Sequence, residues 1–104
     1  MFEQEIEKGI AFLDEKMPGW LELVDPERLD MNLADIVNNC GCVLAQIGAP
    51  DDSYYWLCEE LGIENQDYLY GFSIKSTISD EYAWYMLTAE WQAKLRELNA
   101  ERAS

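Results

Sequence analysis

The last quarter of the chain carries apolar residues at helical spacing, and this stripe constrains the fold more than any other feature. It recurs every three or four positions, at Trp84, Leu87, Trp91, Leu95 and Leu98. Side chains at this spacing share one face of an α-helix, and that face must pack against a core. We therefore predict a long C-terminal helix that begins at a Ser79 cap and runs to about Arg102.

Three shorter segments show the same spacing between turn signals. They are predicted to form helices over residues 3–17, 40–47 and 54–61. Pro18-Gly19 ends the first, Asn39 caps the second and Gly62 follows the third. Asp25-Pro26 supplies a cap and a first helical residue for a short turn, whereas residues 63–79 are interpreted as loop.

These elements predict a mainly α fold. Hydrophobic residues make up 49% of the sequence, which is enough to bury a core despite the high charge. A length of 104 residues fits one domain. We expect residues 1–104 to form a small single-domain bundle of four or five short helices with a long C-terminal helix.

Acidic residues outnumber basic ones, and the excess is concentrated in the middle of the chain. The sequence holds 21 Asp+Glu, 7 Lys+Arg and no His, for a formal net charge of −14. Residues 29–74 contain eight of the acids and no base. Such a surface repels phosphate backbones and anionic lipid, so we expect no direct nucleic-acid binding and no membrane binding. The expected partner is the basic surface of a host or phage protein.

A cytoplasmic location follows from what the chain lacks. Its longest apolar runs span four or five residues, well below the ~20 of a transmembrane helix. The stretch Met1–Glu5 shows neither the basic region nor the apolar region of a secretory leader. We therefore expect the protein in the host cell cytoplasm.

Groups that perform catalysis or bind metals are scarce. Cys40, Cys42 and Cys58 offer three thiols, but a structural zinc site needs four ligands and C-x-C is not the usual spacing. No cation in the base-free segment would stabilise a thiolate, and no phosphate loop or nucleophile motif is present. We predict free thiols, no metal, no cofactor and no enzymatic activity.

The candidate partner-binding residues are acids and aromatics of the middle third. They are Asp51, Asp52, Glu59, Glu60, Glu64, Asp67, Tyr55 and Trp56. Clustered carboxylates also suit Mg²⁺ or Ca²⁺, but the ligand pattern of a calcium loop is missing, which favours a solvated acidic face. Aromatic side chains among the acids are typical of a protein-binding patch, although partial burial of amphipathic rings would also place them there.

Six short strings in order along the chain resemble small, uncharacterised proteins of actinobacterial phages and prophages. They are Leu13–Trp20, Leu29–Met31, Cys42–Ile47, Leu61–Ile63, Tyr70–Phe72 and Leu87–Trp91. The resemblance implies a phage setting and supplies no catalytic residues.

Two functions fit these observations. The first is a phage-derived inhibitor that presents a phosphate-mimicking carboxylate face to a host nucleic-acid-binding protein, for example a CRISPR effector. The second is a regulatory or assembly accessory protein that binds its partner through an exposed aromatic patch, with charge serving solubility.

Overall fold

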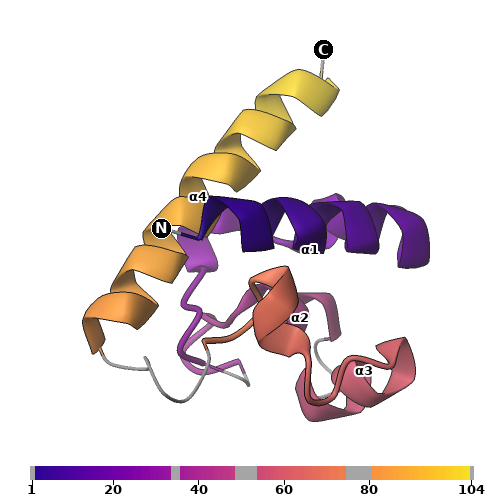
Figure 1. Ribbon diagram of the computed structural model, residues 1–104. Coiled ribbons are helices and arrows are strands. Elements are labelled where there is room, and N and C mark those ends of the chain that lie inside the picture. The colour runs from indigo at the N-terminus through magenta and orange to yellow at the C-terminus, as the bar shows by residue number, and fades with distance from the viewer. Residues whose placement is uncertain (1, 34–35, 49–53, 75–80, 104) are drawn as a thin grey trace.

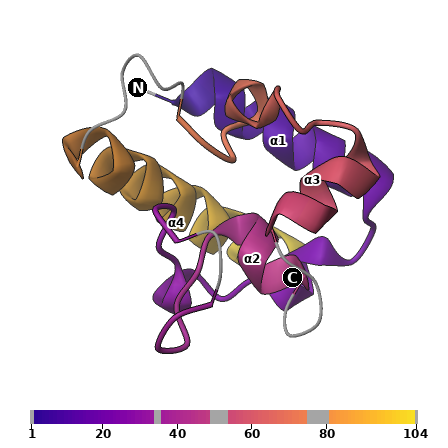
Figure 2. The same cartoon turned by 90° about the horizontal axis from the view of Figure 1, so that it is seen from below.

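The computed structural model describes residues 2–33, 36–48, 54–74 and 81–103 and is mainly helical, with a long C-terminal helix as predicted (Figure 1). Its elements in chain order are α1 (Glu3–Lys16), η1 (Trp20–Leu23), η2 (Pro26–Arg28), α2 (Val43–Gly48), α3 (Tyr54–Leu61), η3 (Asp67–Tyr70) and α4 (Glu81–Ala103), where η marks a 3₁₀ turn. Figure 1 shows α1 and α4 crossing, with α2 and α3 below α1. Figure 2 shows α3 close to α2 and away from most of α4.

The core lies between these elements and is centred on the apolar stripe of α4. Leu87, Trp91 and Leu95 have no exposed surface, and Leu98 is also buried. Trp84 is only partly buried but packs against the core, and its neighbour Ala83 is buried in it. Ser79, the predicted cap of this helix, lies outside the described residues.

A row of aromatic rings connects α1 to α4 through the η3 turn. Phe12 lies 4.7 Å from Tyr70 between ring centroids, Tyr70 lies 6.2 Å from Phe72, and Phe72 lies 6.0 Å from Trp91. The buried Trp91 indole also donates a hydrogen bond of 2.6 Å to the Gly71 carbonyl. Offset ring contacts add to the burial of these large side chains, so the row fixes η3 between the two long helices.

Glycines allow α1 and η3 to pack backbone against backbone. A Cβ added at Gly9 would overlap the Tyr70 carbonyl oxygen. Gly71 ends η3 with φ +74°, and a Cβ there would lie 3.0 Å from the Ile6 nitrogen. The expected loop over residues 63–79 is therefore wrong at Asp67–Tyr70, where this close packing stabilises a 3₁₀ turn.

The α2 helix begins three residues later than predicted. Asn38 and Asn39 have φ of 51° and 67° and form the two-residue turn of a small hairpin. Val37 and Cys40 close it with hydrogen bonds of 2.8 and 2.9 Å between their backbones. This turn chemistry is preferred in short hairpins and interrupts the helical spacing, so Asn39 is no helix cap. Instead, the Ala45 N–H donates to the Cys42 sulfur at 3.4 Å.

Two other local predictions are confirmed. The Asp25 side chain accepts a hydrogen bond of 2.9 Å from the Glu27 N–H and caps η2, with Pro26 at its first position. The α3 helix spans the predicted residues and ends at Gly62, which has φ +75°. Ile63 then donates to the Cys58 carbonyl at 2.9 Å, which completes a glycine-dependent helix end.

Candidate functional site

The predicted partner-binding acids that the structure describes lie on α3 and the segment after it. Glu59 and Glu60 are exposed on the last turn of α3, and Glu64 is exposed just beyond it. Asp67 is half-buried and accepts a hydrogen bond from the Tyr68 N–H at 3.0 Å. We call these four residues the α3–η3 acidic face.

Four of the predicted residues cannot be placed on this face. Asp51 and Asp52 lie outside the described residues, as do the side chains of Tyr55 and Trp56.

Burial of the opposite side of α3 positions the acids. Leu57 and Cys58 are 4% and 2% exposed and pack in the core, where α3 contacts α2. Ile63, 2% exposed, returns the chain to the core directly after the Gly62 turn. With these anchors in the core, Glu59, Glu60 and Glu64 lie in solvent.

Four basic side chains, those of Lys16, Lys94, Arg96 and Arg102, bind acids elsewhere. The ion pairs of the described residues are Lys16–Glu15, Lys94–Glu7, Lys94–Glu97, Arg96–Glu27 and Arg102–Asp14. Every acid in these pairs belongs to the first or last third of the chain. Within the described part of the chain, Glu59, Glu60 and Glu64 have no ion pair. In the part of the chain that the structure describes, the carboxylates of Glu59, Glu60 and Glu64 are thus not paired with a cation.

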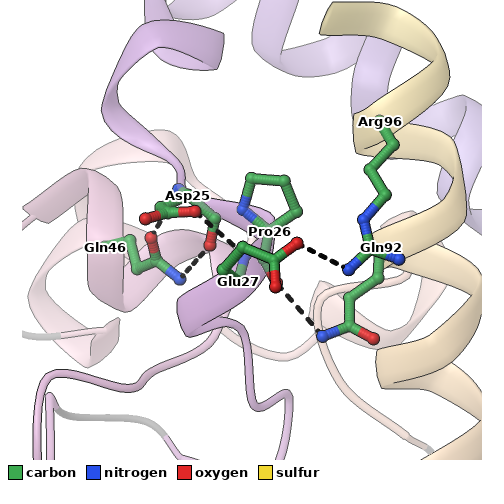
Figure 3. A network of polar contacts seen from close by, with 6 residues as sticks. All are labelled: Asp25, Pro26, Glu27, Gln46, Gln92 and Arg96. Carbon is green, nitrogen blue, oxygen red and sulfur yellow. Dashed lines mark hydrogen bonds and ion pairs between the residues drawn. The ribbon is translucent and has the colours of Figure 1, made fainter.

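A network of polar contacts around η2 holds one of these cations, Arg96 (Figure 3). Arg96 of α4 donates a 2.8 Å hydrogen bond to Glu27, and Gln92 donates a 3.1 Å bond to the Pro26 carbonyl. On the other side of η2, the Gln46 amide of α2 accepts from the Asp25 N–H at 2.7 Å. The network joins α2, η2 and α4 and holds the Arg96 guanidinium on Glu27.

The structure also reveals exposed aromatic residues that the sequence interpretation missed. Tyr82 and Tyr85 of α4 are 64% and 70% exposed. They lie one helical turn apart, on the flank of the apolar stripe, and this off-stripe position was the available signal. The middle-third Tyr70, by contrast, packs against Phe12.

The chemistry available to the site is binding through carboxylates and aromatic rings. Among the described residues, no three His, Cys, Asp or Glu side chains are grouped to hold a metal ion. None of the three cysteines, all within the described part of the chain, forms a disulfide. Burial raises the pKa of Cys42 to about 12, so its thiol stays protonated at neutral pH.

Comparisons of the chain with protein-family models, with curated protein sequences and with solved structures found no match. The resemblance to actinobacterial phage proteins stays a prediction. Among the helices of the described residues, none combines the length and apolar character needed to cross a bilayer.

Proposed function

We propose that this chain is an acidic protein-interaction domain that binds the basic surface of a nucleic-acid-binding protein and inhibits it. The observation that carries the proposal is the α3–η3 acidic face. Glu59, Glu60 and Glu64 are exposed, and in the described part of the chain they have no ion pair. The bases Lys94 and Arg96 instead bind acids of the terminal thirds.

The physical basis is competition for the same cations. A cleft that binds a nucleic acid holds Lys and Arg side chains against a dense row of phosphates and exchanges small ions when it does so. Carboxylates held on a folded surface attract the same side chains. Together with the resemblance to phage proteins, this supports a phage-derived inhibitor of a host protein, for example a CRISPR effector.

The test compares two double variants with the same change in net charge. In Glu59→Lys with Glu60→Lys the acidic face is reversed, whereas Glu22→Lys with Glu81→Lys changes exposed acids elsewhere. Partners captured from an actinobacterial host lysate are first identified and checked for duplex DNA binding. Each is then titrated with both variants at low and high salt, with a DNA duplex as competitor.

We expect the face variant to lose affinity by at least about tenfold and to show a flatter salt dependence, with the control variant near the parent. The DNA duplex should displace the parent protein from its partner. Equal affinity of the face variant and the control variant would exclude the α3–η3 acidic face as the inhibitory surface.

The exposed rings of Tyr82 and Tyr85 favour a second candidate function. Aromatic side chains in solvent at a helix surface are typical anchors of protein interfaces. A regulatory or assembly accessory that binds through them would lose more than about 1 kcal/mol of binding free energy on Tyr82→Ala or Tyr85→Ala. Acid reversals on α3 would then mainly slow association, which separates the two functions in one binding series.

A further inference from the structure

Two adjoining hollows are lined by residues of α1 and α4. Figure 1 shows these two helices crossing. Their volumes are about 280 and 220 Å³, and both are lined by Glu7 of α1 and Lys94 of α4. Each is smaller than the roughly 300–1,000 Å³ of a typical small-molecule site. They match single side chains better than a cofactor.

The two hollows have apolar floors and acidic rims. Ile6 and Ala93 contribute the apolar surface of the larger one, and Ile10 and Leu98 that of the smaller. The rim of the larger hollow adds the carboxylates of Glu3, Glu7 and Glu97. Glu90 also lines this hollow and accepts a hydrogen bond from the Phe2 N–H at 2.8 Å. An occupant that suits both surfaces has an aliphatic stem and a positive head, as Arg and Lys side chains do.

The protein's own Lys94 already places an aliphatic stem and a positive head at the hollows. Its side chain is 28% exposed, and its ammonium lies 3.6 Å from Glu7 and 3.7 Å from Glu97. The Lys94 ammonium thus pairs with two carboxylates between the hollows, and the rim keeps a net negative charge. Charge complementarity therefore selects a basic occupant.

We propose that the α1–α4 groove docks a basic amphipathic segment of a partner protein, which inserts an Arg or Lys side chain into the larger hollow. The segment's apolar residues cover the floor around Ile6 and Ala93, and its cationic head lies against Glu97. The Lys94 ammonium competes with that head for the same carboxylate. This docking site is independent of the proposed function, because it uses acids other than those of the α3–η3 acidic face.

The probe is a synthetic helical peptide with Arg and Leu on one face, titrated into the full chain by calorimetry. A second peptide has each Leu replaced by Gln. Ala93→Trp fills the larger hollow, and Ala100→Trp places the same side chain on exposed α4 surface as its control. Thermal melting shows that each variant is folded.

We expect Ala93→Trp to weaken peptide binding by at least about tenfold and Ala100→Trp to leave it unchanged. The Gln peptide should bind the parent correspondingly weakly. Lys94→Met removes the competing cation and should raise affinity about twofold to fivefold above the matched control Lys16→Met. A gain in affinity is not expected of a merely structural lysine.

Three outcomes would overturn the proposal. They are unchanged binding by Ala93→Trp, equal binding of the two peptides, and equal affinities of Lys94→Met and Lys16→Met. A peptide weakened by Glu59→Gln with Glu60→Gln, yet insensitive to Ala93→Trp, would support the α3–η3 acidic face and exclude the groove.

Discussion

Arg102 binds Asp14 through both terminal guanidinium nitrogens, at 2.9 Å each, and so fastens the end of α4 to the end of α1. The Trp20 indole donates to the same carboxylate at 2.9 Å. The hydrogen bonds from Arg102 lower the pKa of Asp14, burial opposes that shift, and the Trp20 bond adds to it. A two-pronged pair of this kind is more specific in geometry than a single surface contact.

The lowered pKa predicts an acid-sensitive contribution to stability. The ionised Asp14 stabilises the fold above its ordinary pKa of 3.8, and this contribution is lost as the pH falls through the lower folded value. Both partners are part-exposed, so Asp14→Asn should lower the free energy of unfolding at pH 7 by at most about 1 kcal/mol. Urea unfolding at pH 7 and pH 2 measures the difference between parent and variant.

That difference should shrink as the pH falls from 7 to 2, because protonation of Asp14 in the folded chain removes the ion pair with Arg102. Glu22→Gln, at an exposed acid outside the ion pairs of the described residues, is the control and should unfold like the parent at both pH values. A gap between parent and Asp14→Asn that is equally large at pH 2 would show that the charge is not its cause.

A second prediction concerns the buried amide of Gln46, which is 5% exposed. Its nitrogen donates to the carbonyls of Asp25, Arg28 and Gly41 at 3.3, 3.0 and 3.1 Å. Gln46→Glu keeps the shape but turns a carboxylate oxygen toward these carbonyls. We expect a loss of about 3 kcal/mol or more at pH 7, measured by urea unfolding.

The same surroundings should raise the pKa of the new carboxyl, so the loss decreases as the pH falls toward 5. Gln46→Met removes the amide donor, leaves these carbonyls only their backbone N–H partners and adds no charge, so its deficit should not change with pH. Parallel pH profiles for the two variants would contradict this explanation.

Helical spacing predicts α1, α3 and α4 closely because each buries one face of a regular helix. The stripe of α4 needs only its own periodicity, and Leu87, Trp91 and Leu95 are fully buried as expected. The exposure of Glu59 and Glu60 likewise follows from the side of α3 that faces away from its apolar residues. The local sequence pattern is enough to predict burial and exposure where a residue lies on one face of a regular helix.

Periodicity fails where long-range contacts decide. The η3 turn has four residues, too few for a spacing signal, and it depends on the backbone of Gly9 far away in the chain. The α1–α4 groove exists only because the crossing brings Glu7 to Lys94. The late start of α2 is different, since the Asn38-Asn39 pair was a readable hairpin signal that the helical spacing obscured.

A third prediction follows from the contact between α1 and η3. Alanine normally stabilises a helix interior relative to glycine by roughly 1 kcal/mol. At Gly9, however, the added Cβ would overlap the Tyr70 carbonyl, which is backbone and cannot rotate away. Overpacking should dominate, so Gly9→Ala should destabilise the protein by about 1–3 kcal/mol in urea unfolding.

Gly19 provides the comparison for this variant. It has φ +89° and nothing within 4 Å of an added Cβ, so Gly19→Ala meets backbone strain without a clash. That strain is worth about 1–2 kcal/mol. The proton resonances of Tyr70 and Phe12 distinguish a clash from backbone strain. Only Gly9→Ala should shift them. Stabilisation by Gly9→Ala would mean that η3 is not packed against α1.

The last prediction concerns the two thiols on either side of Gly41. Cys42 is 1% exposed and accepts the Ala45 N–H, whereas Cys40 is half-buried in the small hairpin. Burial raises the pKa of Cys42 to about 12, and only the thiolate attacks an aromatic disulfide reagent. At pH 8, Cys40 should therefore react first, and Cys40→Ser should leave only slow labelling that follows unfolding.

The raised pKa of Cys42 also predicts that the fold loses stability at high pH. Below the ordinary thiol pKa of 9.0, Cys42 is protonated in both the folded and the unfolded chain, and stability does not depend on its titration. As the pH rises from 9.0 toward about 12, the unfolded chain loses this proton more readily than the folded one, so the free energy of unfolding falls. Cys42→Ala cannot ionise and should lack this pH-dependent component of stability, although it loses packing at every pH.

Peptide mapping after the labelling reaction identifies which cysteine is modified. Labelling of Cys42 as fast as Cys40 in the folded protein would contradict the buried thiol.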